Sequence, residues 1–275
     1  MCLNQYLADN DNRAKFTSFL QHKFGYGQWS SPSWFIGMEE GGGNTCAEVV
    51  SRIQEWPYQH NNGHLECQPL ANLMPYCDAI GAHQWQHLPQ PTWEKLIRLV
   101  LLVENVPITD EAVINAQIHR LGNSASNCGN ALNLLEFSPL PSPGIRTWHY
   151  EFCDFAEHLP HEAFAGGFGT RDELLQNGLG AQRCQALIDA ITRSSRTLNR
   201  IVFYGRTHFA GYFQQILNHF QALPLAQVPD QANAQFQCGF LTVNNRRIPV
   251  LWVPHPARGN WPNASLVAAA QWLAN

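Results

Sequence analysis

The chain is poor in lysine and has no long apolar stretch. Of its 275 residues only three are lysines, all before residue 96. The longest apolar run, 99–103, is far too short to cross a bilayer, so we expect no membrane association. The first residues have no basic start and no apolar segment follows them, which predicts a cytoplasmic protein without a secretion signal.

The sequence also has no CxxC pair, although it contains eight cysteines. In a chain without a secretion signal, scattered cysteines favour reduced, buried thiols. The spacing of His60, His64, Cys67 and Cys77 could hold zinc, but residues of these types also fill ordinary loops. We therefore predict no metal and no cofactor.

Charge is distributed unevenly along the chain. The net charge is −4, but residues 1–137 hold 7 basic and 13 acidic side chains, whereas residues 138–275 hold 10 and 8. From Arg193 to the end there are seven arginines against one acid, Asp230. This excess of arginine predicts that the last third of the chain forms a surface that binds phosphate groups. The alternative is that these arginines cap helices or pair with acids of the first half.

Short apolar strands alternate with helices. Strands are expected at 34–38, 131–137, 201–205, 240–243 and 248–253. Helices are expected at 4–22, 44–55, 92–105, 110–121, 171–177, 181–194, 208–220 and 264–274. The alternation predicts an α/β fold, a three-layer α/β/α sandwich with a mostly parallel central sheet. Without a repeat or linker, we predict one domain over 1–275, a monomer, with a polar insertion at about 57–91.

Three of the predicted strands end in polar loops, and such loops bind ligands at the carboxyl edge of an open α/β sheet. The first strand, Trp34–Met38, runs into two glutamates and three glycines, whose backbone can approach a ligand closely. The strand at 131–137 contains Asn133 and Glu136 and is followed by a proline-rich turn. The last strand is followed by a His-Pro turn that begins at His255.

In this order, the three segments resemble the motifs of the uracil-DNA glycosylase superfamily. Gly37–Gly41 (Gly-Met-Glu-Glu-Gly) matches the frame Gly-x-(Asp/Asn/Ala)-Pro-Gly and is most like the single-strand-selective and mismatch-specific branches. Asn133 precedes Pro139 as in the middle motif, and His255–Ala257 (His-Pro-Ala) is similar to the last motif, His-Pro-Ser. The resemblance covers roughly residues 30–260 and implies a glycosylase fold. It also implies an enzyme that flips a nucleotide out of DNA and hydrolyses its N-glycosidic bond, leaving an abasic site.

The resemblance implies a role for each residue of these loops. Glu39, with Glu40 as the alternate, would stabilise the positive charge that develops on the sugar, and His255 would donate to a carbonyl of the base. Asn133 would read the edge of a pyrimidine, with Glu136 as the alternative reader. The base pocket would also include Gly37, Met38, Gly41 and Gly42. DNA contacts would come from Arg206, Arg258 and Asn260.

The sequence departs from the family pattern in ways that concern the substrate. Glu40 replaces the usual proline, Ala257 replaces a phosphate-binding serine, and Gly42 stands where an aromatic side chain would narrow the pocket. The glycines leave room for a base larger than uracil. The superfamily includes a bacterial anti-phage glycosylase that removes glucosylated hydroxymethylcytosine from phage DNA. The resemblance and these departures therefore imply, as the expected substrate, a uracil-type base or a bulky modified cytosine of phage DNA, the latter with a defence role.

Two other classes of protein remain as alternatives. A non-catalytic nucleic-acid-binding protein on the same fold would keep the arginines without needing Glu39 or His255. A small-molecule hydrolase or nucleotide-processing enzyme could use a similar sheet. The sequence, however, has no GxSxG, GxxxxGK[ST] or GxGxxG motif.

Overall fold

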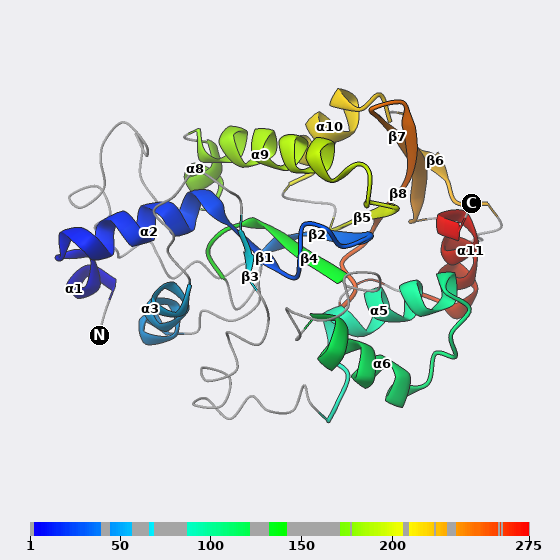
Figure 1. Cartoon of the computed structure of the whole chain (residues 1–275), viewed down its shortest axis with the longest axis horizontal. Coiled ribbons are helices and arrows are strands. Elements are labelled where there is room, and N and C mark those ends of the chain that lie inside the picture. Colours follow the sequence, from blue (N-terminus) through cyan, green and yellow to red (C-terminus); the bar gives the residue numbers. More distant parts are fainter. Residues whose placement is uncertain are drawn as a thin grey trace.

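The computed structural model describes residues 3–39, 45–56, 66–68, 87–121, 132–141, 171–176, 178–205, 209–222, 224–229, 235–257, 259 and 261–274. Helices α1 (Leu3–Leu7) and α11 (Asn263–Ala274) lie at opposite ends of the longest axis (Figure 1). Within the ranges above, no helix combines the length and apolarity needed to cross a membrane.

An eight-stranded sheet with the order β3-β1-β4-β2-β5-β8-β7-β6 forms the centre of the fold. Its strands are β1 (Lys23–Tyr26), β2 (Ser33–Glu39), β3 (Glu66–Gln68), β4 (Leu132–Ser138), β5 (Arg200–Tyr204), β6 (Ala226–Gln227), β7 (Gln237–Val243) and β8 (Arg246–Val253). The strands β4, β2, β5 and β8 are neighbours and parallel, so their carboxyl ends meet at one edge. The expected α/β fold with mostly parallel central strands is therefore confirmed.

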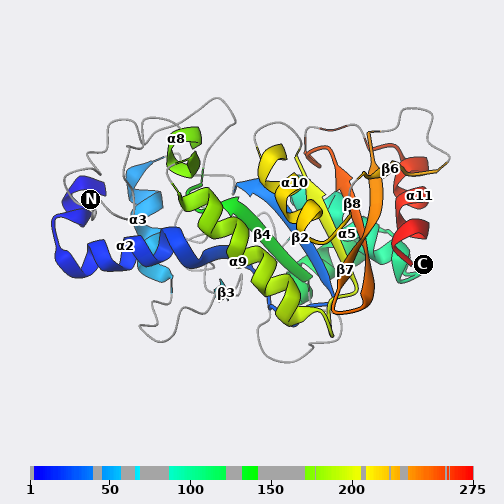
Figure 2. The same cartoon turned by 90° about the horizontal axis from the view of Figure 1, so that it is seen from above.

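Helices cover both faces of this sheet (Figures 1 and 2). Besides α1 and α11, they are α2 (Asn10–His22), α3 (Cys46–Glu55), α5 (Pro91–Val103), α6 (Asp110–Ala116), the π-helix η3 (Gln117–Leu121), α8 (Arg171–Gln176), α9 (Leu179–Ser194) and α10 (Ala210–His219). Alternate residues of a strand point to opposite faces. In β5, Ile201 and Phe203 pack with α9 and α10, whereas Val202 and Tyr204 pack with α5 and α11.

Side-chain caps explain where several helices begin. Asp9 accepts hydrogen bonds from the backbone N–H groups of Asp11 and Asn12, so the helix expected over 4–22 is divided into α1 and α2. Thr45 caps α3 by accepting from the N–H of Glu48. At the start of α5, Gln90 accepts from two N–H groups and proline occupies the first turn.

Some elements differ from the prediction. The segment Lys23–Tyr26 is a buried strand, which a lysine and a lack of alternation hid in the sequence. The helix expected over 110–121 changes to π-helical hydrogen bonding at Gln117. Strand β7 begins at Gln237, three residues before the expected start. Of the polar insertion expected at 57–91, all but β3 and the residues from 87 onward lie outside the described part of the chain.

A fully buried arginine on α9 joins the separate parts of the fold. The guanidinium of Arg183 donates to the carbonyl oxygens of Phe137 (2.6 Å), Leu20 (2.8 Å), Lys23 (2.9 Å) and Glu136 (2.9 Å). Its carbon Cζ also lies 3.9 Å from the centre of the Phe24 ring. Burial lowers the pKa of Arg183 to about 9, which leaves the group charged at neutral pH. One side chain thus links α9 to α2, β1 and the end of β4.

Replacing Arg183 should destabilise the protein strongly. The substitution Arg183→Met keeps much of the side-chain length but leaves four buried carbonyl groups without this donor, so we expect the free energy of unfolding to fall by at least about 3 kcal/mol. Urea denaturation at pH 7 measures the loss. Arg193→Met, at an exposed position on the same helix, is the control and should change stability by less than about 0.5 kcal/mol. A loss below about 1 kcal/mol for Arg183→Met would contradict the role of this network.

Candidate functional site

The carboxyl ends of β4, β2, β5 and β8 bring distant segments of the sequence together. Gly37 of β2 pairs with Glu136 of β4, and Tyr204 of β5 pairs with Val253 of β8, two residues before His255. The chain leaving β4 and β5 passes to α9 and α10 on one face, whereas the chain between β2 and β4 includes α5 and α6 on the other. In open α/β sheets, ligands bind at the carboxyl edge where the connections diverge in this way.

A hydrogen bond crosses the sheet at this edge. The Tyr204 hydroxyl donates to Glu136 Oε1 at 2.8 Å, and the two side chains are only 1% and 5% exposed. Their strands are not neighbours, because β2 lies between β5 and β4. Since neighbouring strands are about 4.8 Å apart, the phenol must lie across β2 to reach the carboxylate.

Gly37 is the residue of β2 that lets the phenol cross. A Cβ atom at this position would lie 2.1 Å from Tyr204 Cζ and 2.3 Å from its hydroxyl oxygen. Such distances are far inside van der Waals contact, so any side chain here would displace the ring. Glycine is therefore required at this position by the close approach of the Tyr204 ring to the β2 backbone, and the predicted contact of Gly37 with a base stays a prediction.

His255 packs beside the Tyr204 ring and is less buried than it. Its ring is 5.8 Å from the Tyr204 ring, centre to centre, and lies edge-on to it. The backbone N–H of Ala257 donates to His255 Nδ1 at 3.2 Å. This bond needs a lone pair on Nδ1, so a neutral ring carries its proton on Nε2. The imidazole is half-buried, and it is held as a hydrogen-bond donor at Nε2.

Two of the predicted base-binding residues lie away from this group. Asn133 is fully buried and, being three residues before Glu136 on the same strand, is on the opposite face of the sheet. Its Oδ1 lies 3.1 Å from where a Cβ on Gly27 would be, deep inside the fold. Met38 packs in the core between the sheet and α9 and α10. The structure brings together Gly37, Glu136 and His255 but not Asn133 or Met38.

Other predicted residues are not placed by the structure. The backbone of Glu39 ends β2 opposite Ser138, and nothing is described of its side chain. Outside the described residues lie Glu40, Gly41, Gly42, Arg206, Arg258 and Asn260. The same holds for His60, His64 and Cys77, and Cys67 is described only as backbone in β3. Across the described ranges, no group of three His, Cys, Asp or Glu side chains could hold a metal ion.

The arginines of the last third do not surround this edge in the described part of the chain. Arg200 begins β5 and Arg246 begins β8, which places both at the opposite, amino edge of the sheet. Arg246 donates to the carbonyl of Ser195, the residue that ends α9, and Arg247 stacks on the Phe240 ring at 4.0 Å. Arg246 thus caps the carboxyl end of α9, which agrees with the alternative interpretation that these arginines cap helices.

Tyr204 is a candidate residue that the sequence analysis missed. It ends an apolar strand, where a tyrosine is an ordinary core residue, and only the spatial order of the strands places it beside Glu136. The one feature of the sequence that could have indicated it is a tyrosine hydroxyl at the carboxyl end of a buried strand. The resulting group contains a carboxyl, a phenol and an imidazole, which can together accept and donate hydrogen bonds to a polar ring.

Comparisons with known proteins add little to this geometry. No protein-family model matches the chain, and no curated protein matches it. Among solved structures, the chain is similar to a domain of unknown function (DUF1537) from Bordetella bronchiseptica, a domain-swapped dimer with bound citrate. The two are 12% identical with a TM-score of 0.29, and the match covers 89% of this chain and 41% of that one.

The close approach at Gly37 can be tested by stability. In Gly37→Ala the new methyl group would overlap the Tyr204 ring, so we expect the free energy of unfolding to fall by about 1–3 kcal/mol. The control is Gly211→Ala, at an exposed site on α10 where an added Cβ would have no neighbouring atom within 4 Å. This substitution should raise the free energy of unfolding by about 1 kcal/mol, and chemical denaturation compares the two variants. Adding Tyr204→Ala should remove the penalty at Gly37. If Gly37→Ala and Gly211→Ala change the free energy of unfolding equally, the Tyr204 ring does not contact the β2 backbone closely.

Proposed function

We propose that the chain is a DNA glycosylase that flips a non-standard pyrimidine nucleotide out of DNA and hydrolyses its N-glycosidic bond. The observation that carries the proposal is the hydrogen bond from Tyr204 to Glu136 beneath His255, at the edge where α/β sheets bind ligands. These three residues supply an acceptor and a donor for a polar ring. The proposal includes the finer fold expected from the sequence, a glycosylase-type three-layer α/β/α sandwich.

His255 stabilises the charge that develops on the leaving base. As the glycosidic bond breaks, negative charge accumulates on the carbonyl oxygen of the pyrimidine, and a donor aimed at that oxygen lowers the barrier. The bond from the Ala257 N–H to Nδ1 supports this role, because it leaves Nε2–H as the donor of a neutral ring. No proton has to be transferred for this stabilisation.

Glu136 reads the base and favours a cytosine-type substrate over uracil. An ionised carboxylate only accepts hydrogen bonds, and Tyr204 already donates to one of its oxygens. The exocyclic amino group of cytosine is a donor, whereas uracil presents a carbonyl at the same position. Between the two substrates expected from the sequence, this chemistry supports the modified cytosine.

Glu39 and the loops after the strands complete the proposed site. The backbone of Glu39 ends β2 opposite Ser138, two residues beyond the paired Gly37 and Glu136. In the proposal, Glu39 or Glu40 stabilises the sugar cation and orients water. Arg206, Arg258 and Asn260, in the loops that follow β5 and β8, contact the DNA backbone.

The activity can be tested with defined DNA. Purified protein is incubated with oligonucleotides that carry one uracil and with phage DNA that carries glucosylated hydroxymethylcytosine, and alkali then cleaves any abasic sites. We expect strand breaks with the wild-type protein and at least a hundredfold fewer with His255→Ala, because a well-placed donor contributes about 10²–10³-fold to the rate. The double variant Glu39→Ala/Glu40→Ala should also abolish the breaks, because it removes both candidate carboxylates.

The control is His219→Ala, an exposed histidine on α10 that should keep full activity. If no DNA yields breaks while the protein still binds DNA, the non-catalytic nucleic-acid-binding protein is the better account. If neither breaks nor binding are found, the whole assignment to DNA is wrong.

The reading role of Glu136 gives a separate prediction. Glu136→Gln replaces one acceptor oxygen by an amide that can donate to a carbonyl, so activity should shift from cytosine-type toward uracil-type bases by about 1–3 kcal/mol of discrimination. The ratio of kcat/KM for the two oligonucleotides measures the shift. Tyr204→Phe, which removes only the donor to Glu136, should lower activity on both bases. An unchanged ratio in Glu136→Gln would show that this residue does not contact the base.

A further inference from the structure

A cavity lies away from the proposed glycosylase site. It has a volume of about 410 Å³ and is formed by the end of α5, by α6 and by η3. Its apolar lining includes Leu101, Val106 and Ala112, and its polar lining includes Asn115, His119 and Arg120. The π-helix η3 contributes His119 and Arg120, and π-helical turns occur frequently at functional sites. The argument that follows does not depend on the proposed glycosylase activity.

Arg120 and Glu104 line this cavity, and a third charged residue, Arg200, lies close enough for their charges to act on it. Arg120 forms a two-fold hydrogen bond with Glu104, at 2.6 and 3.0 Å. Arg200, the first residue of β5, is on the same sheet face as Tyr204, and its Nε and Nη1 atoms are buried without a hydrogen-bond partner among the described residues. Burial is the main cause that lowers the pKa of Arg200, with Glu104 raising it and Arg120 lowering it further. Among the described residues, two cations thus lie near one anion.

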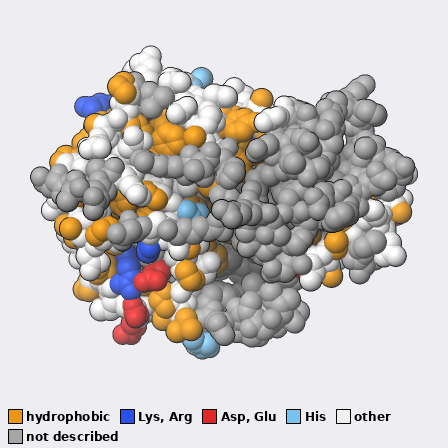
Figure 3. All heavy atoms as spheres, turned by 180° about the vertical axis from the view of Figure 1, so that it is seen from behind, with side chains coloured by type: hydrophobic (Ala, Val, Ile, Leu, Met, Phe, Trp, Pro, Cys, Tyr) orange, Lys and Arg blue, Asp and Glu red, His pale blue; other side chains and the backbone are white. Residues whose placement is uncertain are grey.

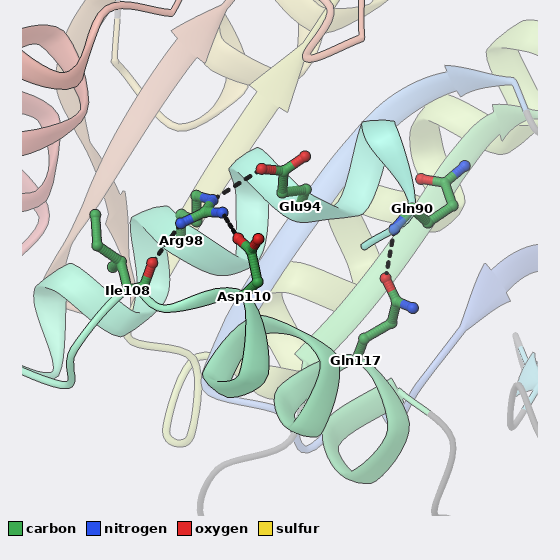
Figure 4. Close-up of polar contacts among 6 residues, drawn as sticks. All are labelled: Gln90, Glu94, Arg98, Ile108, Asp110 and Gln117. Atoms are coloured by element: carbon green, nitrogen blue, oxygen red, sulfur yellow. Dashed lines mark hydrogen bonds and ion pairs between the residues drawn. The ribbon is translucent and has the colours of Figure 1, made fainter. Parts of the chain in front are cut away.

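The walls of the cavity are held by hydrogen bonds at both ends of α6. Figure 4 shows Arg98 of α5 between Glu94 and Asp110, with a further bond to the carbonyl of Ile108 before α6. At the other end, the Gln117 side chain accepts from the N–H of Gln90 at 2.9 Å. These contacts fix α6 and η3 against α5, so the cavity is a formed feature of the fold.

The same side of the molecule has a concentration of charge. Figure 3 shows basic and acidic side chains gathered on the lower part of that face, on the side that α5 and α6 occupy in Figure 1. The ion pairs of this region are Arg98 with Glu94 and Asp110, and Arg120 with Glu104. Among the described side chains, Arg98 is paired with two carboxylates, whereas Arg120 and the nearby Arg200 are matched by the one carboxylate of Glu104. An anion is therefore favoured at the cavity.

We propose that this cavity binds a small organic anion with an apolar body. The apolar side chains at 101, 106 and 112 would contact the body, and the excess positive charge of Arg120 and Arg200 over Glu104 would attract a carboxylate or phosphate group. The site lies near the amino end of β5, opposite the edge that carries Glu136 and His255. It is a second binding site of the fold.

Binding of simple aromatic probes to the full chain tests the proposal. Benzoate and phenyl phosphate share one apolar ring and separate the two kinds of anion, while benzylamine carries the opposite charge. We expect saturable binding of at least one anion with a Kd below about 1 mM in calorimetry, and binding of benzylamine at least tenfold weaker. Ala112→Phe, which fills the cavity without changing charge, should abolish binding.

Charge variants distinguish the site from a nonspecific surface. Arg120→Gln should weaken anion binding at least tenfold, and Glu104→Gln should strengthen it several-fold, because it removes the competing carboxylate. Glu111→Gln, an exposed position on α6, is the matched control and should leave binding unchanged. Thermal unfolding of each variant verifies folding. The proposal is overturned if no anion saturates, if benzylamine binds equally well, or if Ala112→Phe leaves binding unchanged.

Discussion

The fold depends on one buried guanidinium. Arg183 reaches from α9 to the last turn of α2, the first residue of β1 and the carboxyl end of β4, and it satisfies four carbonyl groups. None of the described carboxylates pairs with this buried charge, so the carbonyl dipoles and the Phe24 ring must compensate for the lost water. The benefit is rigidity at one place: the backbone of Glu136 is held by Arg183, and the side chain of the same residue is held by Tyr204.

The candidate site follows from that fixed point. Arg183 fixes the backbone of Glu136. To reach its carboxylate, the Tyr204 side chain has to cross β2, and Gly37 leaves the space for this crossing. Function is then argued from the chemistry of the side chains at the strand ends. A carboxylate that accepts, and an imidazole held as a donor by the Ala257 N–H, match the two kinds of polar group on a cytosine ring. This match supports the proposed base excision.

Much of the fold could be predicted from the sequence, because apolar runs such as Trp34–Met38 and Val250–Val253 are typical of buried parallel strands. The strand Lys23–Tyr26 could not, since its burial depends on distant partners and its lysine contradicts a core pattern. In the site, Gly37, Glu136 and His255 were predicted from strand ends. Tyr204 was missed because only strand order, which long-range packing decides, places it beside Glu136. Asn133 was predicted to join them, but the two-residue period of a strand puts it on the other face.

Mass spectrometric detection of the free base tests the central claim most directly. The protein is incubated with duplexes that each contain one uracil, one cytosine or one glucosylated hydroxymethylcytosine, and the released small molecules are identified. The account predicts release of the modified cytosine by the wild-type protein and none by His255→Ala. Release of uracil alone would contradict the reading role of Glu136. Release of no base from any duplex would contradict the glycosylase activity itself.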